Sequence, residues 1–152
     1  MEFETWNLEL HMFTYQYPRP AVTVDAILIS PEKKVLLIER GREPYQGRWA
    51  LPGGFINMDE DLETACQREL EEETGIRVER LQQFKAFGDV NRDPRHRTIS
   101  VLFYAFTEAE IQATAGDDAA KAQWFPIGQL PELAFDHRQI LEDFRNEILK
   151  PS

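Results

Sequence analysis

The chain contains 152 residues, of which 42% are hydrophobic and 29% charged, the balance expected of one globular domain spanning residues 1–152. Its formal net charge of −10 and its single cysteine, Cys66, argue against a nucleic-acid-binding surface, an internal disulfide and a cysteine metal cluster. No apolar run approaches the roughly 20 residues of a membrane span, and the N-terminus lacks a signal-peptide pattern. The sequence therefore predicts a cytoplasmic protein without membrane contacts.

The first part of the chain predicts an irregular extension followed by a β-hairpin. Residues 1–20 are rich in aromatic side chains and end in a proline-containing stretch. The runs AVTVDAILI (21–29) and KVLLIER (34–40) are apolar and β-branched, and the SPEK turn between them favours a hairpin. The following GRWALPGG (47–54) has the proline and glycines typical of turns.

A helix, a second group of strands and a final helix are predicted next. Nothing between Asp59 and Thr74 breaks a helix, and Gly75 stands where a helix C-terminal glycine belongs. Three further runs have the composition of strands: 76–90, 98–107 and 122–127. Residues 136–150 predict a C-terminal helix because apolar side chains recur at helical spacing. This order of elements predicts an α/β or α+β fold, in which helices cover a mixed β-sheet.

The first predicted helix carries an unusual acidic run, RELEEETG, at its C-terminal end. At about 100° per residue, Glu69 and Glu73 extend the apolar stripe, Glu72 flanks it and Glu71 points away. Like charges at helical spacings of three and four cost roughly 0.2–0.5 kcal/mol per pair, and the helix dipole disfavours acids at this end. A compensating cation is therefore expected. Mg²⁺ or Mn²⁺, which prefer hard oxygen ligands, suit three converging carboxylates best.

Residues 54–76 resemble the Nudix box, G-x5-E-x7-R-E-U-x-E-E-x-G-U, in which U is a bulky apolar residue. The matching positions are Gly54, Glu60, Arg68, Glu69, Leu70, Glu72, Glu73, Gly75 and Ile76. The resemblance implies a Nudix fold, with a mixed β-sheet sandwiched between α-helices and the box forming a metal-binding loop–helix–loop. Members of this family hydrolyse nucleoside diphosphates linked to another moiety. Many have a glycine just before the first box glutamate, where this chain has Asp59.

The same resemblance assigns roles to the box residues. Glu69, Glu72 and Glu73 are expected to hold the metal, with the carbonyl of Gly53 as a further ligand. Structural support of the box is expected from an ion pair between Glu60 and Arg68, together with Gly54 and Gly75. A metal ion in such a site would neutralise the diphosphate and lower the pKa of a bound water.

Substrate contacts are expected outside the box, from arginines that can donate two parallel hydrogen bonds to phosphate. Arg40, Arg42 and Arg48 precede the box, and the RDPRHR turn supplies Arg92, Arg95 and Arg97. For any one turn arginine, a solvated surface charge is an equally good interpretation. Two aromatic residues, Trp49 and Phe55, are candidates for stacking on adenine, although aromatic side chains beside a sheet more often belong to the core.

Three stretches resemble the ADP-ribose pyrophosphatase branch of the family: PRPAVTVD (18–25), DVNRDPR (89–95) and GDDAAKAQWF (116–125). The leading hypothesis is a hydrolase that cleaves ADP-ribose to AMP and ribose 5-phosphate. The alternatives are a Nudix hydrolase of another nucleotide, such as an oxidised nucleoside triphosphate or a dinucleotide, and a non-catalytic ADP-ribose sensor. A regulator would need a DNA-reading module, and the predicted final helix ends near Lys150, which argues for the enzyme.

Two further expectations concern the base and the oligomer. Box glutamates committed to metal are poor proton acceptors, so an acidic residue in the glycine-led loop TAGDDAAKA is a candidate base, Asp118 ahead of Asp117. Two solvated turn aspartates are an equally good interpretation, in which case Glu69 becomes the base. The aromatic side chains of residues 1–20 predict a homodimer, unless this segment packs on its own domain.

Overall fold

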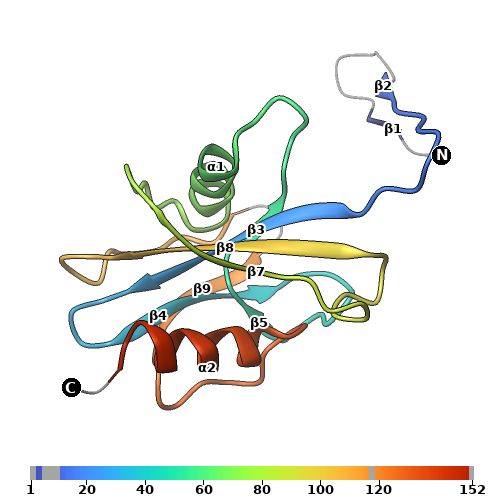
Figure 1. Cartoon of the computed structure of the whole chain (residues 1–152). Coiled ribbons are helices and arrows are strands. Elements are labelled where there is room, and N and C mark those ends of the chain that lie inside the picture. The colour runs from blue at the N-terminus through green and yellow to red at the C-terminus, as the bar shows by residue number, and fades with distance from the viewer. Residues whose placement is uncertain (1–2, 5–10, 117–118, 151–152) are drawn as a thin grey trace.

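A mixed β-sheet lies between two helices in the computed structural model, which describes residues 3–4, 11–116 and 119–150 (Figure 1). The sheet contains seven strands: β3 (Ala21–Ile29), β4 (Lys34–Arg40), β5 (Trp49–Ala50), β6 (Gly53–Phe55), β7 (Gln82–Phe87), β8 (Thr98–Phe106) and β9 (Ala119–Pro126). The helices are α1 (Leu62–Thr74) and α2 (His137–Glu147), one on each side of the sheet. The predicted fold class is confirmed.

The strand order explains how distant segments reach one edge of the sheet. β3 runs parallel to β8 along its whole length, whereas every other pair in this sheet is antiparallel. β3 and β4 meet at only one register pair, and β6 then pairs with β3 while β5 and β9 pair with β4. The sheet therefore opens between β3 and β4 at the end that carries β5 and β6.

Strand alternation divides the core into two layers. Along β3, Val24, Ala26 and Leu28 pack under α1, while Ile27 and Ile29 pack under α2. Both faces of this strand are buried because each is covered by a helix, which is why the run is apolar throughout. Neither helix, within the described ranges, has the length and apolar character needed to cross a bilayer.

The hairpin strands at 21–29 and 34–40 and the glycine at the end of α1 were predicted correctly. Gly75 has φ 75°, in the left-handed region, and its N–H donates to the carbonyl of Glu71 at 2.8 Å. Several boundaries were wrong by a few residues: α1 begins at Leu62, β8 ends at Phe106, β9 runs from Ala119 to Pro126, and α2 covers only His137–Glu147.

The prediction of one strand over residues 76–90 was wrong, because β7 covers only Gln82–Phe87. The residues just before β7 are bound to α1 instead of to a neighbouring strand. The amide of Gln67 donates to the carbonyls of Val78 and Glu79, and Leu81 N–H donates to Glu63. These side chains take the backbone groups that a strand would have paired.

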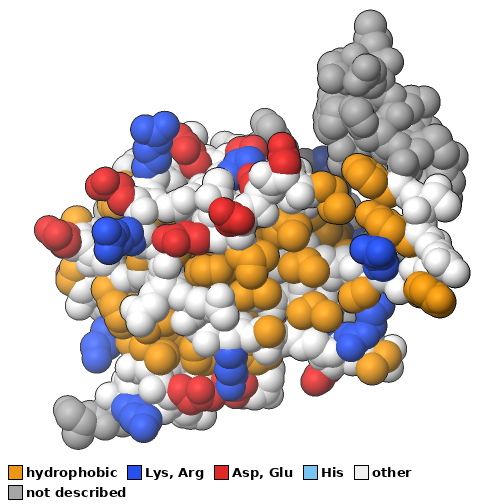
Figure 2. All heavy atoms as spheres, turned by 45° about the horizontal axis from the view of Figure 1, so that its top comes forward, with side chains coloured by type: hydrophobic (Ala, Val, Ile, Leu, Met, Phe, Trp, Pro, Cys, Tyr) orange, Lys and Arg blue, Asp and Glu red, His pale blue; other side chains and the backbone are white. Residues whose placement is uncertain are grey.

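Side chains outside the core are unevenly distributed. Figure 2, turned so that the top of Figure 1 comes forward, shows Asp and Glu gathered toward its upper left. Hydrophobic side chains occupy much of the middle of this face. The acidic net charge of the chain is thus partly a local feature of one face.

Candidate active site

A pocket of about 320 Å³ opens at the end of the sheet where β3 and β4 separate. One side is acidic and is formed by Asp25, Glu69 and Glu73. The other side is mainly basic and contains Arg40, Arg42, Arg92 and Arg95, with Asp93 bound to Arg95. Two aromatic residues, Phe55 and Phe135, and a histidine, His137, complete the part of the lining that bears on chemistry. A pocket with opposed charges suits a ligand that carries both an anion and a bound cation.

Helix α1 brings two of the predicted acids to this pocket. The Glu69 side chain is 15% exposed, and burial raises the pKa of its carboxyl group. Glu73 accepts a hydrogen bond from Gly53 N–H at 2.9 Å, which ties the helix to β6. Both residues lie on the side of α1 that the helical period predicts to face the core.

The third predicted metal acid is placed differently. Glu72 is 54% exposed, lies outside the pocket lining and forms an ion pair with Arg68 at 3.3 Å. It sits one turn beyond Arg68 on the same helix face, so this pairing needs no other element. Across the described residues, no group of three or more acidic, histidine or cysteine side chains stands ready to enclose a metal ion. Of the three glutamates expected to converge on a metal, Glu69 and Glu73 line the pocket and Glu72 does not.

Two glycines allow the close approach between β6 and the acids. A Cβ on Gly54 would lie 2.6 Å from the carboxyl carbon of Glu69, so this carboxylate fills the space that a side chain would need. A Cβ on Gly53 would lie 2.1 Å from the carbonyl oxygen of Val24. The buried carboxylates and adjacent backbone carbonyls are hard oxygen donors, and this donor set fits Mg²⁺ or Mn²⁺.

The expected ion pair between Glu60 and Arg68 is present. The two side chains make a bidentate contact, at 2.5 Å from Nε and 2.9 Å from the second guanidinium nitrogen. Arg68 also donates to the carbonyl of Phe55 at 3.2 Å, while Glu60 accepts from Asn57 N–H at 2.9 Å. The hydrogen bond from Arg68 lowers the pKa of the Glu60 carboxyl group. This pair fixes the loop after β6 against α1.

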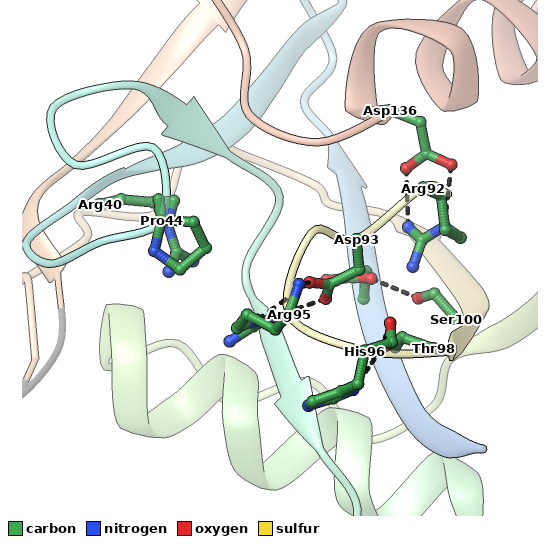
Figure 3. A network of polar contacts seen from close by, with 10 residues as sticks. Arg40, Pro44, Arg92, Asp93, Arg95, His96, Thr98, Ser100 and Asp136 are labelled. Carbon is green, nitrogen blue, oxygen red and sulfur yellow. Dashed lines mark hydrogen bonds and ion pairs between the residues drawn. The ribbon is translucent and has the colours of Figure 1, made fainter. Parts of the chain in front are cut away.

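Two of the three turn arginines, Arg92 and Arg95, are held by carboxylates, as Figure 3 shows. Arg92 is only 4% exposed and makes bidentate hydrogen bonds of 2.9 and 2.7 Å to Asp136. Arg95 is bound by Asp93 at 3.0 and 2.8 Å. The interpretation of this turn as solvated charge is wrong for Arg92, because Asp136, which immediately precedes α2, removes it from solvent. Arg97 donates to the carbonyl of Gly88 at 2.6 Å and lies outside the lining.

Of the three arginines before the box, two line the pocket and one does not. Arg40 and Arg42 line the pocket, and Arg40 Nε donates to the carbonyl of Pro44 at 2.6 Å. Burial lowers the pKa of Arg40, and the nearby charge of Arg95 lowers it further. Arg48, in contrast, lies outside the pocket lining, with its guanidinium 5.3 Å from the ring centre of Tyr45.

Only one of the two aromatic candidates lines the pocket. For Trp49 the stacking role is wrong and the core interpretation is right, because it packs edge-on against Phe125 at 4.7 Å, beside the core cluster under α2. Successive side chains of β5 point to opposite faces, so Ala50 reaches the pocket and Trp49 cannot. Phe55 does line the pocket, where the guanidinium of Arg95 lies 5.1 Å from its ring centre.

Two residues of the pocket lining, Asp25 and His137, were not predicted, nor was Ser100, which binds Asp25. Ser100 Oγ donates a short hydrogen bond to the buried carboxylate of Asp25, and burial raises the pKa of that carboxyl group. His137 Nδ1 accepts the N–H of Leu51 at 3.0 Å, so the neutral imidazole carries its proton on Nε2. Asp25 could have been noticed as the one acidic residue in an apolar strand, whereas nothing in the sequence distinguishes His137.

The buried histidine predicts a pH dependence of stability. Burial lowers the pKa of His137, so the unfolded chain binds this proton more readily than the folded chain does. The stability contribution of a neutral His137 is complete above about pH 6.5 and is lost as the pH falls toward its lowered folded-state pKa. We expect the free energy of unfolding to fall by up to about 2 kcal/mol more between pH 7 and pH 5 in the wild type than in His137→Asn.

Urea unfolding at both pH values measures this difference. Asn can keep the hydrogen bond from Leu51 N–H through its side-chain oxygen, so the variant isolates the titration. His96→Asn is the matched control, because His96 is exposed and its replacement should leave the pH difference unchanged. Identical pH dependence in the wild type and His137→Asn would contradict the prediction.

The two candidate base residues, Asp117 and Asp118, lie outside the described residues. Their described neighbours contact the end of α1: Gly116 N–H donates to the carbonyl of Glu73 at 3.0 Å. A Cβ on Gly116 would lie 1.7 Å from the carbonyl oxygen of Glu72. The start of this loop is therefore packed against the turn of α1 that carries the acids.

Similarity to known proteins agrees with this geometry. The sequence matches the NUDIX domain family over residues 19–144. It is 41% identical over 128 residues to the ADP-ribose pyrophosphatase of Methanocaldococcus jannaschii, covering 84% of this chain and 75% of that relative. It is 34% identical over 133 residues to the ADPR responsive transcriptional repressor NtrR of Acinetobacter baylyi, covering 83% of this chain and 53% of the repressor. The NUDIX domain of Shewanella oneidensis NrtR, solved with ADP ribose, has a TM-score of 0.79 at 33% identity, over 87% of this chain and 90% of that domain.

Proposed function

The chain belongs to the NUDIX domain family and is a Nudix hydrolase, and from this premise we propose that its substrate is ADP-ribose. Hydrolysis of the diphosphate would give AMP and ribose 5-phosphate. The observation that carries the proposal is the pocket with an acidic side on α1 and a basic side on β4 and the turn before β8. The similarity to an ADP-ribose pyrophosphatase and to an ADP-ribose-bound domain supports this choice of nucleotide.

The roles of the residues follow from their placement. Glu69 and Glu73, with Glu72 and the Gly53 carbonyl, would hold Mg²⁺ or Mn²⁺, which when bound neutralises the diphosphate and lowers the pKa of a bound water. Arg40, Arg42 and Arg95 would bind the phosphate oxygens. Arg92 instead holds Asp136 and thereby the start of α2. Phe55 is exposed enough to contact the nucleoside.

A substrate panel tests the proposal. ADP-ribose, other nucleotide sugars, NADH, dinucleoside polyphosphates and nucleoside triphosphates would each be assayed with Mg²⁺ and with Mn²⁺. We expect the highest kcat/KM for ADP-ribose, and complete loss of turnover in EDTA that either metal restores. A higher kcat/KM for another nucleotide in the panel would overturn the choice of ADP-ribose and leave a Nudix hydrolase of that substrate.

A non-catalytic ADP-ribose sensor is the second candidate, favoured by the similarity to the repressor NtrR. The two candidates differ in one measurement. A sensor would bind ADP-ribose and release it unchanged at saturating metal, whereas the enzyme would release AMP. The partly buried glutamates of α1 that line the pocket support the enzyme, because they offer hard oxygen ligands for the metal on which hydrolysis would depend.

We also propose that the loop containing Asp117 and Asp118 supplies the base, with Asp118 preferred. Gly116, the residue before this pair, donates its N–H to the backbone carbonyl of Glu73, and this contact with α1 supports a role for the loop. In Asp118→Asn we expect kcat to fall by about 10²-fold with the affinity for ADP-ribose retained. Asp117→Asn is the paired variant. Normal turnover by both variants from pH 6 to pH 9 would transfer the role to Glu69.

Homodimerisation is a further proposal. Phe13, Tyr15 and Tyr17 are exposed, and Phe13 stacks on Tyr15 at 6.5 Å, with neither ring in the core of its own domain. Exposed rings grouped in this way favour a contact with a second chain. Light scattering at micromolar concentration should give twice the mass of the chain, and deletion of residues 1–17 should give a monomer. A monomeric full chain would contradict the proposal and favour packing of the segment on its own domain.

A further inference from the structure

Two of the three residues before and at the start of α2, Phe135 and His137, line the pocket, and Phe135 has no role so far. Asp136 holds Arg92, and His137 accepts the N–H of Leu51. Phe135 lines the pocket beside them with φ 52°, in the left-handed region that bulky residues rarely adopt. Such backbone strain persists only where the surrounding structure enforces it, and it is often found at functional sites.

The backbone around Phe135 is fixed by hydrogen bonds to β5. Ala134 N–H donates to the carbonyl of Trp49 at 2.8 Å, and Trp49 N–H donates to the carbonyl of Glu132 at 3.1 Å. His137 N–H donates to the carbonyl of Ala134 at 3.1 Å. The segment therefore cannot relax its strained residue without losing its connection to the sheet.

The ring of Phe135 lies beside two arginines of the basic side. The guanidinium carbons of Arg40 and Arg95 are 5.0 and 5.4 Å from its centre. Arg95 is also 5.1 Å from the ring of Phe55, so its guanidinium is in contact distance of two aromatic rings. Tyr45 meets the Phe135 ring edge-on at 4.9 Å and is itself left-handed, with φ 63°. Two aromatic residues with left-handed backbones, Tyr45 and Phe135, are therefore in contact beside the guanidinium groups of the two arginines.

The charges at this point are incompletely compensated. Arg95 is bound by Asp93, whereas Arg40 forms no ion pair within 4.0 Å with any carboxylate of the described residues. Arg40 is partly buried, and the positive charge of Arg95 acts on it against the negative charges of Glu73 and Asp93. A partly buried cation next to a like charge is costly unless an anion joins the two. The opening of the pocket beside them is where such an anion would bind.

We propose that Phe135 is a positioning residue, which holds Arg40 and Arg95 at the spacing that binds the diphosphate of the substrate. This rests on the proposed function, because that function identifies the anion. The ring lies within 5.4 Å of both guanidinium carbons, and its face attracts cations, which offsets part of the repulsion between the two arginines. Its own contact with the substrate is not required. Loss of the ring should therefore weaken binding of the anion and leave binding of the nucleoside unchanged.

Calorimetric titration in EDTA with inorganic pyrophosphate and, separately, with adenosine tests this inference. In Phe135→Leu we expect about tenfold weaker pyrophosphate binding and an unchanged dissociation constant for adenosine. Phe135→Tyr retains the ring and should bind pyrophosphate nearly as the wild type does. Phe125→Leu is the matched control, since Phe125 packs on Trp49 outside the pocket lining and its loss should leave both titrations unchanged.

A double-mutant cycle separates positioning from general destabilisation. Combining Phe135→Leu with Arg40→Leu should weaken pyrophosphate binding much less than the sum of the two single effects. Additive effects, weaker adenosine binding in Phe135→Leu, or a wild type that does not bind pyrophosphate would each overturn the inference. If pyrophosphate binding depends on Phe135 while ADP-ribose is not hydrolysed, the proposed substrate fails and the positioning role stands.

Discussion

Replacing Glu69 or Glu73 with Gln is expected to lower turnover by at least about 10²-fold while the fold is retained. Gln keeps the shape of the side chain and can still accept the hydrogen bond from Gly53 N–H that Glu73 accepts now. What it removes is the negative charge that would hold the metal. Because burial already raises the pKa of Glu69, removing its charge should stabilise the folded metal-free protein slightly.

Glu72→Gln and Glu71→Gln extend this test. Glu72 is paired with Arg68, and we expect it to join the metal site and to show the same loss when replaced. Glu71 is exposed and paired with Arg77 at 3.2 Å, so Glu71→Gln should be almost silent. Turnover and Mn²⁺ binding would be measured in all four variants at saturating metal. Rates near the wild type in both Glu69→Gln and Glu73→Gln would contradict the metal assignment.

The sequence predicts this part of the site well because the information is local. The period of one helix determines that Glu69 and Glu73 face inward and that Glu71 faces solvent. The strands at 21–29 and 34–40 were likewise predicted from runs of apolar and β-branched residues, and each run carries its strand signal within itself. Where the residues that decide a feature are neighbours in the chain, the prediction and the structure agree.

The rest of the pocket depends on contacts between distant segments. Asp25 is bound by Ser100, 75 residues later, and His137 accepts a hydrogen bond from Leu51, 86 residues earlier. Neither pairing leaves a trace in local composition. The same holds for the strand wrongly predicted before β7, whose backbone is taken by side chains of α1. Tertiary hydrogen bonds there override the local preference for a strand.

For the charged residues, too, the sequence predicts the overall balance but not which side chains meet at the pocket. An acidic chain with a net charge of −10 still gathers four arginines on one side of a pocket. Composition alone therefore argues against nucleic acid but not against a small anion. Which arginines take part could not be predicted, because nothing in the local sequence tells that Arg40, at the end of β4, lines the pocket and that Arg48, just before β5, does not. Ion pairs with Asp136 and Asp93 then hold Arg92 and Arg95 in place.

Alanine substitutions at Gly53 and Gly54 should have different effects, the first on stability and the second on turnover. In Gly53→Ala the new Cβ would lie 2.1 Å from the backbone carbonyl oxygen of Val24 and 2.8 Å from Asp25 Cα, both main-chain atoms of β3. Neither can move without opening the pairing between β3 and β6, in which Gly53 is the partner of Asp25. We expect a loss of about 3 kcal/mol or more in the free energy of unfolding, and turnover should disappear with the fold.

Gly54→Ala should behave differently, because its Cβ meets only the carboxylate of Glu69, the far end of a flexible side chain. The carboxylate can move aside, so we expect the free energy of unfolding to change by less than about 1 kcal/mol. A displacement of about 1 Å in a metal-holding group is nevertheless enough to lower turnover by about 10²-fold. Gly128→Ala is the matched control, since nothing lies within 4 Å of its new Cβ, and it should leave stability and rate unchanged. Thermal unfolding and ADP-ribose turnover of the three variants measure both effects. Full activity in Gly54→Ala would mean that the position of Glu69 against β6 does not matter for catalysis.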